Sequence, residues 1–445
     1  MDLFKILNTR ELASSIWVTI SIVFFLIVPS KQKELVTIIK GIFSRKFTTV
    51  YILAALYCAM SCTILYFIKA WDTSLVKDSL FWMFFAALPM MYKSARSKNI
   101  REYFGSTLKS LLTVTVVLEF LMGLHTFSIW LELLLVPISF LLFVLTIFSK
   151  QKPEYSQVQW LFEWTTTIIG VLIVMFEFRY VTTHINDFLK LAYLKQFTLP
   201  ILLSLLFIPF LYLLVIYIRF EETFAILTVR FQNNPNQLYT KILIIRFFLN
   251  DLEGLKRWRQ YIFRTHPQTK KAIKDSIKEI KELQQIEKNP PIIPLAEGWS
   301  PYWVKNILKE VGIHTEYYMH YFEDEWGVTS NNLHLTEDFL ANDIIYNISG
   351  NRKAVTQLKL RLMVFDLSKK ANSHEQFLFY IALLWKKIFD TDLPRSILQA
   401  VMVGKKFRHL EKGCKIEVDL EEYNTALNGY ELKFKIIHAA HPVFE

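Results

Sequence analysis

Long apolar runs dominate the first half of the chain and constrain its fold more than any other feature. A helix needs about 20 largely apolar residues to cross a bilayer, because each residue rises about 1.5 Å through roughly 30 Å of hydrocarbon. About seven runs before Arg219 meet or approach this length, and ordinary globular composition returns after it. The sequence therefore predicts an α-helical polytopic membrane bundle with about seven transmembrane helices. The expected spans lie near residues 13–28, 47–68, 75–92, 108–124, 129–148, 160–178 and 197–218.

The same change in composition divides the chain into three predicted parts. Residues 1–219 are the transmembrane domain, residues 220–299 an amphipathic helical connector that ends in a proline-rich linker, and residues 300–445 a soluble α+β domain. In the last part, apolar and charged residues alternate along residues 416–420 and again along residues 430–436. Such alternation is typical of strands with one buried face, so it predicts two strands of one sheet.

Basic residues in the short loops predict the orientation, because positively charged segments resist translocation. Lys and Arg gather after the first, third and fifth expected spans, for example at Lys31, Arg96 and Lys150. With an odd number of spans, the N-terminus lies outside and the α+β domain lies in the cytoplasm. We therefore expect a protein of the plasma (inner) membrane.

The net charge of +11 fits contact with anionic lipid headgroups. The strongest local pattern for such contact follows the last span, where basic and aromatic residues alternate. Basic and aromatic residues in alternation also suit single-stranded nucleic acid, and this alternative stays open, but so close to a membrane we favour lipid as the partner. The residues predicted to contact headgroups are Lys256, Arg257, Trp258 and Arg259.

Ionisable residues near the ends of the expected spans form a second candidate site. A charge in hydrocarbon is costly, so it is usually retained for a function. On the predicted outer side, several such residues could form a polar mouth of the bundle; the alternative is that the carboxylates simply reach the headgroup region. The candidates are Glu119, His125, Glu132, Glu177 and Arg179.

A third candidate site lies in the predicted cytoplasmic domain, where histidines and acids crowd a short stretch. Such a mixture could bind a ligand, but it lacks the spacing of a metal site, and a solvated acidic turn is the alternative. We expect no metal and no cofactor. The candidate residues are His314, His320, Glu323 and Asp324.

No motif specific enough to name a reaction occurs in the chain. It contains no Walker loop, G-x-G-x-x-G, G-x-S-x-G, H-E-x-x-H or paired C-x-x-C motif. The leading hypothesis is therefore a non-enzymatic sensor, scaffold or effector, in which the cytoplasmic domain binds a protein or small ligand and couples it to the bundle. A partner protein or self-association fits this hypothesis, and bacterial defence or stress is a setting in which such an architecture would serve.

Two alternatives remain open. In one, the bundle is a channel, transporter or permeability effector gated by the cytoplasmic domain. In the other, the soluble part is a membrane-tethered enzyme whose class the sequence does not reveal.

Overall fold

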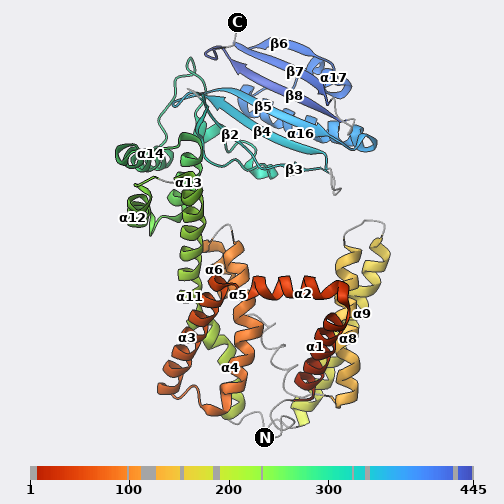
Figure 1. Cartoon of the computed structure of the whole chain (residues 1–445). Helices are drawn as coiled ribbons and strands as arrows, with labels where there is room; N and C mark the ends of the chain where they lie inside the picture. Colours follow the sequence, from red (N-terminus) through yellow and green to blue (C-terminus); the bar gives the residue numbers. More distant parts are fainter. Residues whose placement is uncertain are drawn as a thin grey trace. The chain divides into compact units, whose positions relative to one another are not determined.

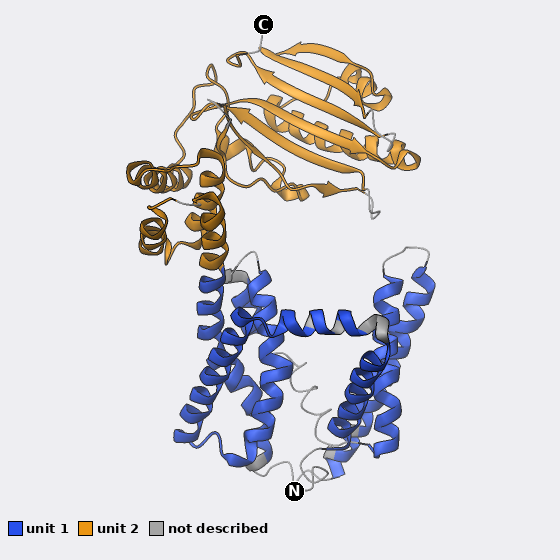
Figure 2. Cartoon of the chain, viewed as in Figure 1, with its two compact units in different colours: residues 1–218 blue, residues 219–445 orange. Residues whose placement is uncertain are grey.

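The computed structural model describes residues 8–442 except 98–99, 112–126, 151–154, 184–190, 232–233, 323–324, 336–340 and 424–428. The chain forms two compact units, residues 1–218 and residues 219–445 (Figure 2).

Six helices among the described residues are long and apolar enough to cross a membrane. This confirms the prediction of a membrane protein with several transmembrane helices. The fourth expected span, residues 108–124, lies mostly outside the described residues, and only its first residues fall within α6 (Ile100–Leu111). The six candidates are α1 (Thr9–Ile27), α3 (Arg45–Phe67), the segment Thr73–Arg96, α8 (Ile129–Ser149), most of α9 (Ser156–Thr183) and most of α11 (Leu191–Arg230) (Figure 1).

The segment Thr73–Arg96 changes its helical form along its length. It runs as η2 (Thr73–Leu75), α4 (Val76–Trp82), the π-helical turn η3 (Met83–Ala87) and α5 (Leu88–Arg96). Pro89 stands at the start of α5, where its ring would clash with the carbonyl of Phe85 in a regular α-helix. The wider π turn directly before it removes that clash.

Two kinds of contact hold the first unit together. Its apolar cluster joins α3, the α4–α5 segment and α11 through residues such as Cys58, Trp82 and Phe207. Buried polar side chains also link neighbouring helices: Trp82 Nε1 donates to Ser204 Oγ at 3.0 Å. α1 packs on α8, and Trp17 Nε1 donates to the Leu133 carbonyl at 2.9 Å.

Helix α2 (Pro29–Ile42) lies between α1 and α3 in the sequence. The sequence repeats apolar residues at helical spacing from Leu35 to Phe43, and so predicts a helix that lies in the membrane interface. Val36, Ile39 and Ile42 are each 45% exposed, so its apolar residues are open to the surroundings. Placement at headgroup depth stays a prediction.

The second unit begins with the end of α11 and three further helices, α12 (Gln237–Phe248), α13 (Leu252–Thr265) and α14 (Lys270–Lys288). The helices begin where the sequence supplies a cap. Asp251 accepts from the Gly254 amide at 2.8 Å at the start of α13, and Thr269 accepts from Ala272 at the start of α14. Trp258 of α13 is fully buried and donates to Ser276 Oγ of α14 at 2.9 Å.

An antiparallel sheet with the strand order β1-β2-β4-β5-β8-β7-β6 makes up most of the second unit, and β3 pairs with β4. This confirms the expected C-terminal sheet domain. The expected strands at residues 416–420 and 430–436 are the central parts of β7 and β8, paired through Ile416 and Ile436. The strands are β1 (Met319–Phe322), β2 (Glu325–Thr329), β3 (Leu333–His334), β4 (Asp343–Gly350), β5 (Val355–Val364), β6 (Phe407–Glu411), β7 (Cys414–Glu422) and β8 (Tyr430–His438).

Helices α16 (Lys370–Phe389) and α17 (Arg395–Val403) cover one face of the sheet (Figure 1). The apolar side chains of β5 and β8, such as Leu360 and Phe434, are fully buried on the side of these helices. The residues that alternate with them, such as Lys359 and Lys433, form the opposite, polar face. The short helix α15 (Pro301–Val304) precedes the sheet in the sequence.

Candidate functional site

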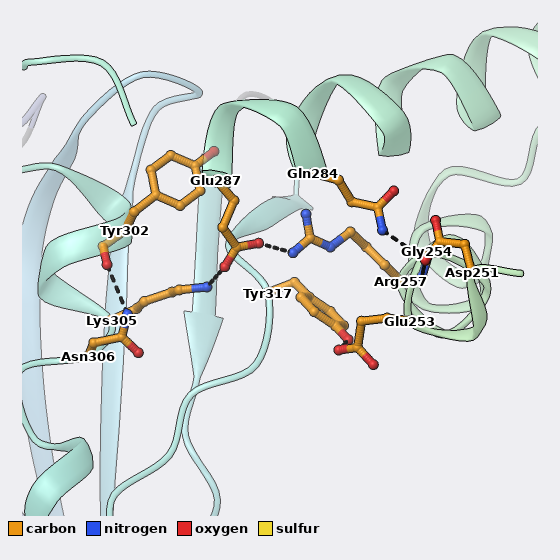
Figure 3. A network of polar contacts seen from close by, with 10 residues as sticks. All are labelled: Asp251, Glu253, Gly254, Arg257, Gln284, Glu287, Tyr302, Lys305, Asn306 and Tyr317. Carbon is orange, nitrogen blue, oxygen red and sulfur yellow. Dashed lines mark hydrogen bonds and ion pairs between the residues drawn. The ribbon is translucent and has the colours of Figure 1, made fainter. Parts of the chain in front are cut away.

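A network of charged side chains joins α13 and α14 to the segment that leads into the sheet (Figure 3). Its centre is Glu287 near the end of α14, which accepts from Arg257 of α13 and from Lys305, the residue after α15. Arg257 is only 4% exposed and Lys305 only 9%. One carboxylate therefore compensates two buried cations.

The electrostatics of this centre follow from its geometry. Burial raises the pKa of Glu287, but the hydrogen bonds from Lys305 and Arg257 outweigh it, so the pKa of the carboxyl lies below its ordinary value. Glu287 is thus ionised at neutral pH. Removing one member of such a buried set leaves uncompensated charge, which is strongly destabilising.

A second set of contacts ties α13 to the residues just before β1. Lys256 pairs with Glu316 at 2.9 Å, and the Tyr317 hydroxyl donates to Glu253. The guanidinium of Arg257 lies 4.2 Å from the ring centre of Tyr317, within the range of a cation–π interaction. These contacts hold α13 and the start of the sheet in one arrangement.

The chain of ion pairs reaches α11 as well. Arg259 of α13 pairs with Glu222 of α11 at 2.6 Å. On the other side of α13, its capping residue Asp251 pairs with Lys281 of α14 at 2.5 Å. α13 is therefore connected by charged contacts to α11, to α14 and to the segment before β1.

A cavity of about 310 Å³ lies where α11, α13 and β2 meet in the second unit. Its wall combines cations, hydrogen-bonding groups and aromatic rings, so it suits a small polar ligand with an anionic group. The pKa of Glu316 lies below its ordinary value, because bonds from Lys256 and Gln260 outweigh burial, which raises it. The lining residues are Ile226, Arg259, Gln260, Phe263, Arg264, Glu316, Tyr317, Val328 and Thr329.

The four residues expected to contact headgroups lie on α13 and differ in accessibility. Trp258 is fully buried and Arg257 is 4% exposed, so both contribute to the interior of the unit and neither presents a surface to lipid. Lys256 and Arg259 are partly exposed but are held by Glu316 and Glu222. We therefore assign Arg257 and Trp258 an internal role and not headgroup contact.

Two of the four residues expected to form a cytoplasmic ligand site, His314 and His320, lie within the described part of the chain. His314 is exposed in the loop before β1, where its backbone N–H donates to Asn331 Oδ1 at 2.7 Å. His320 lies on β1, edge-on to the ring of Trp326. Glu323 and Asp324 lie outside the described residues. Within the described ranges, no group of three or more His, Cys, Asp or Glu side chains is arranged to hold a metal ion.

Of the residues expected at a polar mouth, Glu132 is the best defined. It lies in the first turn of α8, is 2% exposed, and pairs with Arg10 of α1 at 3.2 Å. Arg179 is an exposed residue near the end of α9. Glu119, His125 and the side chain of Glu177 lie outside the described part of the chain.

The first unit contains a cavity of about 590 Å³, to which polar side chains of α1 contribute. One side is a stripe of polar residues along α1, and the other side is formed by two phenylalanines around the α4–η3 segment. Glu11 at one end of the stripe pairs with Lys77 at 3.1 Å. The lining residues are Asn8, Arg10, Glu11, Ser14, Ser15, Val18, Thr19, Phe81 and Phe85.

Sequence reasoning did not select Glu287 and Lys305. Glu287 is one of several acids in the Lys- and Glu-rich helix α14, and no local pattern marks it. Comparisons with protein-family models, with curated proteins and with solved structures give no match. The functional interpretation therefore depends on the geometry of this chain alone.

Proposed function

We propose that the second unit binds a small ligand and passes the binding event to the membrane helices through α11. The observation that carries this proposal is the cavity beside Arg259, because its wall includes Ile226 of α11. The same helix contains one of the six candidate spans, Tyr193–Arg230. A ligand in the cavity would touch a helix that continues into the first unit.

The ion pairs around α13 support the coupling. A ligand that displaces α13 changes the Arg259–Glu222 pair on α11, and it also strains the buried centre at Glu287. Buried, fully compensated charges resist partial displacement, since an uncompensated charge costs several kcal/mol (roughly 3–5 kcal/mol for a buried pair). The arrangement therefore favours movement of these elements together.

The orientation belongs to the same proposal. The basic loops favour a cytoplasmic second unit and an outside N-terminus in a plasma (inner) membrane, provided that residues 108–124 form a seventh span. A partner protein or self-association and anionic headgroups remain expected partners.

Filling the cavity tests the proposal without a known ligand. Ile226→Trp adds a ring where the ligand would lie, whereas Val229→Trp adds the same ring to a 74% exposed position of α11. The readout is the rate at which Cys62, on α3 beside the apolar cluster shared with α11, reacts with a membrane-permeant thiol reagent. The Cys414→Ser background removes the thiol of the second unit.

We expect Ile226→Trp to change the labelling rate of Cys62 several-fold and Val229→Trp to leave it unchanged. Equal rates in wild type and both folded variants would exclude the coupling. If Ile226→Trp does not fold, Arg259→Gln serves instead, because it removes only the partly exposed pair with Glu222. An unchanged rate in that variant has the same meaning.

A second candidate function, a channel or permeability effector, is favoured by the cavity of the first unit. Polar side chains on a candidate span facing a cavity are typical of solute pathways, and π turns are frequent at functional sites. Purified protein in vesicles should then release small solutes, and Ser15→Leu, which fills the cavity, should slow the release. If vesicles that contain the wild-type protein and vesicles that contain the Ile226→Trp variant both retain their solutes, this candidate is eliminated.

A further inference from the structure

The polar face of the sheet carries a row of matched strand positions that is continuous across five strands. Thr329 of β2 faces Asn347 of β4, Asn347 faces Lys359 of β5, and Lys359 faces Lys435 of β8. Lys435 in turn faces Glu417 of β7. Because directly paired residues point to the same face, these five side chains lie side by side.

Two like-charged pairs occur at the centre of this face. Lys359 is directly opposite Lys435, and Arg361 is directly opposite Lys433. Like charges in cross-strand pairs are destabilising. A sheet that retains two such pairs side by side breaks a local rule, and such positions are expected at functional sites.

Acidic residues compensate three of these four cations. Arg361 pairs with Glu431, Lys433 with Glu431 and Glu421, and Lys435 with Asp419 at 3.0 Å and with Glu417 at 3.4 Å. Glu431 lies on β8 itself. The other three acids lie on β7, which pairs with the edge of β8 that faces away from β5. The side chain of the fourth cation, Lys359, forms no ion pair and no hydrogen bond with any described residue.

The environment of Lys359 is therefore short of negative charge. The side chain is half-buried, and its neighbours include Arg361, Lys433 and Lys435, with Glu431 as the nearby acid. Burial, Arg361 and Lys433 lower the pKa of the Lys359 ammonium below its ordinary value. An anion bound here would remove the repulsion that the protein itself leaves uncompensated.

Asn347, opposite Lys359, has an unused polar atom. Its Nδ2 donates to Thr329 Oγ1 at 2.7 Å, but its Oδ1 is buried and has no hydrogen-bond partner. If the amide is rotated so that Oδ1 accepts from Thr329, Nδ2 is the group left without a partner. In either orientation, one polar group of Asn347 is left without the hydrogen-bond partner that buried polar groups require.

We propose that Lys359 and Asn347 form a binding site for the oxyanion of a small molecule, a phosphate or a carboxylate. The ammonium of Lys359 binds the anionic oxygens. Asn347 donates to the oxyanion through Nδ2, or accepts from a hydroxyl of the ligand through Oδ1. Thr329, which positions Asn347, also lines the cavity beside Arg259. The proposal rests on the proposed function, since it names the chemistry of the ligand that the second unit binds.

Protection of Lys359 from an amine-acylating reagent tests the site in the full-length protein. The extent of acylation at each lysine is read by mass spectrometry in the presence of millimolar inorganic phosphate, acetate or chloride at matched ionic strength. Lys278, which is 77% exposed on α14, is the internal control. We expect phosphate or acetate to slow acylation of Lys359 several-fold relative to chloride and to leave Lys278 unchanged.

The two anions distinguish the two ligand sources: protection by phosphate alone indicates a phosphorylated ligand, and protection by acetate alone a carboxylate. Asn347→Asp should abolish the protection, because it places a negative charge against the anion. Equal acylation of Lys359 in all three salts would overturn the proposal.

Lys359→Met gives a second readout that separates binding from structure. If Lys359 serves a ligand, its removal relieves repulsion and does not destabilise β5; a structural lysine would destabilise it. Faster hydrogen exchange in β5 of this variant would therefore also count against the site. If phosphate or acetate protects Lys359 but Ile226→Trp leaves the labelling rate of Cys62 unchanged, the site is supported and the coupling is refuted.

Discussion

The two units use apolar residues in opposite ways. On α8, Trp130 is 80% exposed and Phe140 is 67% exposed, whereas on β8 Phe434 and Leu432 are fully buried. In the first unit the expected solvent is lipid, so apolar side chains gain nothing by leaving it. In the second unit water drives them to the side of the sheet that α16 and α17 cover.

Polar and charged contacts are also distributed differently in the two units. The first unit buries a few polar links between helices, such as Arg10–Glu132 and Trp82–Ser204. The second unit spreads charges over the polar face of the sheet, and beside Glu287 it buries the two cations Arg257 and Lys305. Exposed rings such as Phe140 are therefore expected to add little to the stability of the first unit, whereas buried rings such as Phe434 stabilise the second.

Truncation of one phenylalanine in each unit gives the largest difference. Phe434→Ala removes a ring from the core of the sheet and should cost about 3–5 kcal/mol. Phe140→Ala removes a ring that faces lipid and should change stability by less than about 0.5 kcal/mol. Hydrogen exchange of the full chain in lipid nanodiscs measures the opening free energy of each unit. Equal losses would show that α8 packs against protein and not lipid.

The buried charge at Glu287 should give the next largest effect. Glu287→Gln leaves Arg257 and Lys305 without their carboxylate and should destabilise the second unit by roughly 2–3 kcal/mol, somewhat below a fully buried pair because Glu287 is 29% exposed. Glu316→Gln, in the exposed pair with Lys256, should cost at most about 1 kcal/mol. The same exchange experiment, read in α13 and α14, compares the two. A loss at Glu316 as large as at Glu287 would refute the central role of Glu287.

In the first unit, hydropathy could predict where a span lies but not the form of its helix. The ends of α3 were expected at residues 47 and 68 and are Arg45 and Phe67, because bilayer thickness alone fixes the length of a span. The π turn before Pro89 was not expected, since hydropathy does not report helix form. Whether residues 108–124 form a seventh span stays a prediction.

In the second unit, local patterns predicted elements but not their assembly. Alternation identified β7 and β8, each with one apolar face. The hairpin β1–β2 was not predicted, because its mixed aromatic and acidic sequence has a register shift between His320 and Phe322 that interrupts the alternation. At the centre of the candidate site, Glu287 contacts Arg257, which lies 30 residues before it in the sequence, and Lys305, which lies 18 residues after it. No local sequence pattern predicts a contact between residues so far apart in the chain.

One hydrogen bond occurs in both units and allows a direct comparison of the two solvents. Trp82 Nε1 donates to Ser204 in the first unit, and Trp258 Nε1 donates to Ser276 in the second. Ser276→Ala leaves a buried indole N–H without a partner and should cost about 1–3 kcal/mol. Ser204→Ala should cost about 0.6 kcal/mol, the average for such bonds between membrane helices. Local exchange near each serine gives both values, and a larger loss at Ser204 would contradict the comparison.

The smallest expected effect is a pH dependence confined to the second unit. His374 of α16 is 1% exposed; its Nδ1 faces the Met402 carbonyl at 3.1 Å and its Nε2 faces the Tyr430 hydroxyl at 2.6 Å. A ring that donates at Nδ1 accepts at Nε2 only when neutral. Burial, with a smaller contribution from Lys370, lowers the pKa of His374 against the opposing bond to Met402. Burial also raises the pKa of Tyr430 to about 12, which keeps its hydroxyl a donor.

Because the pKa of His374 is lower in the folded chain, the unfolded chain binds the proton more readily in mildly acidic solution. The stability that neutral His374 contributes is therefore present above a pH of about 6.5 and is lost as the pH falls through that value, by at most about 1.4 kcal/mol per pH unit. Exchange in α16 and β8 should accelerate accordingly. His374→Gln should remove this part of the pH dependence, whereas His409→Gln on the edge strand β6 should retain it. If the His374→Gln variant loses stability between neutral and mildly acidic pH as steeply as wild type, the buried ring is not the group that titrates.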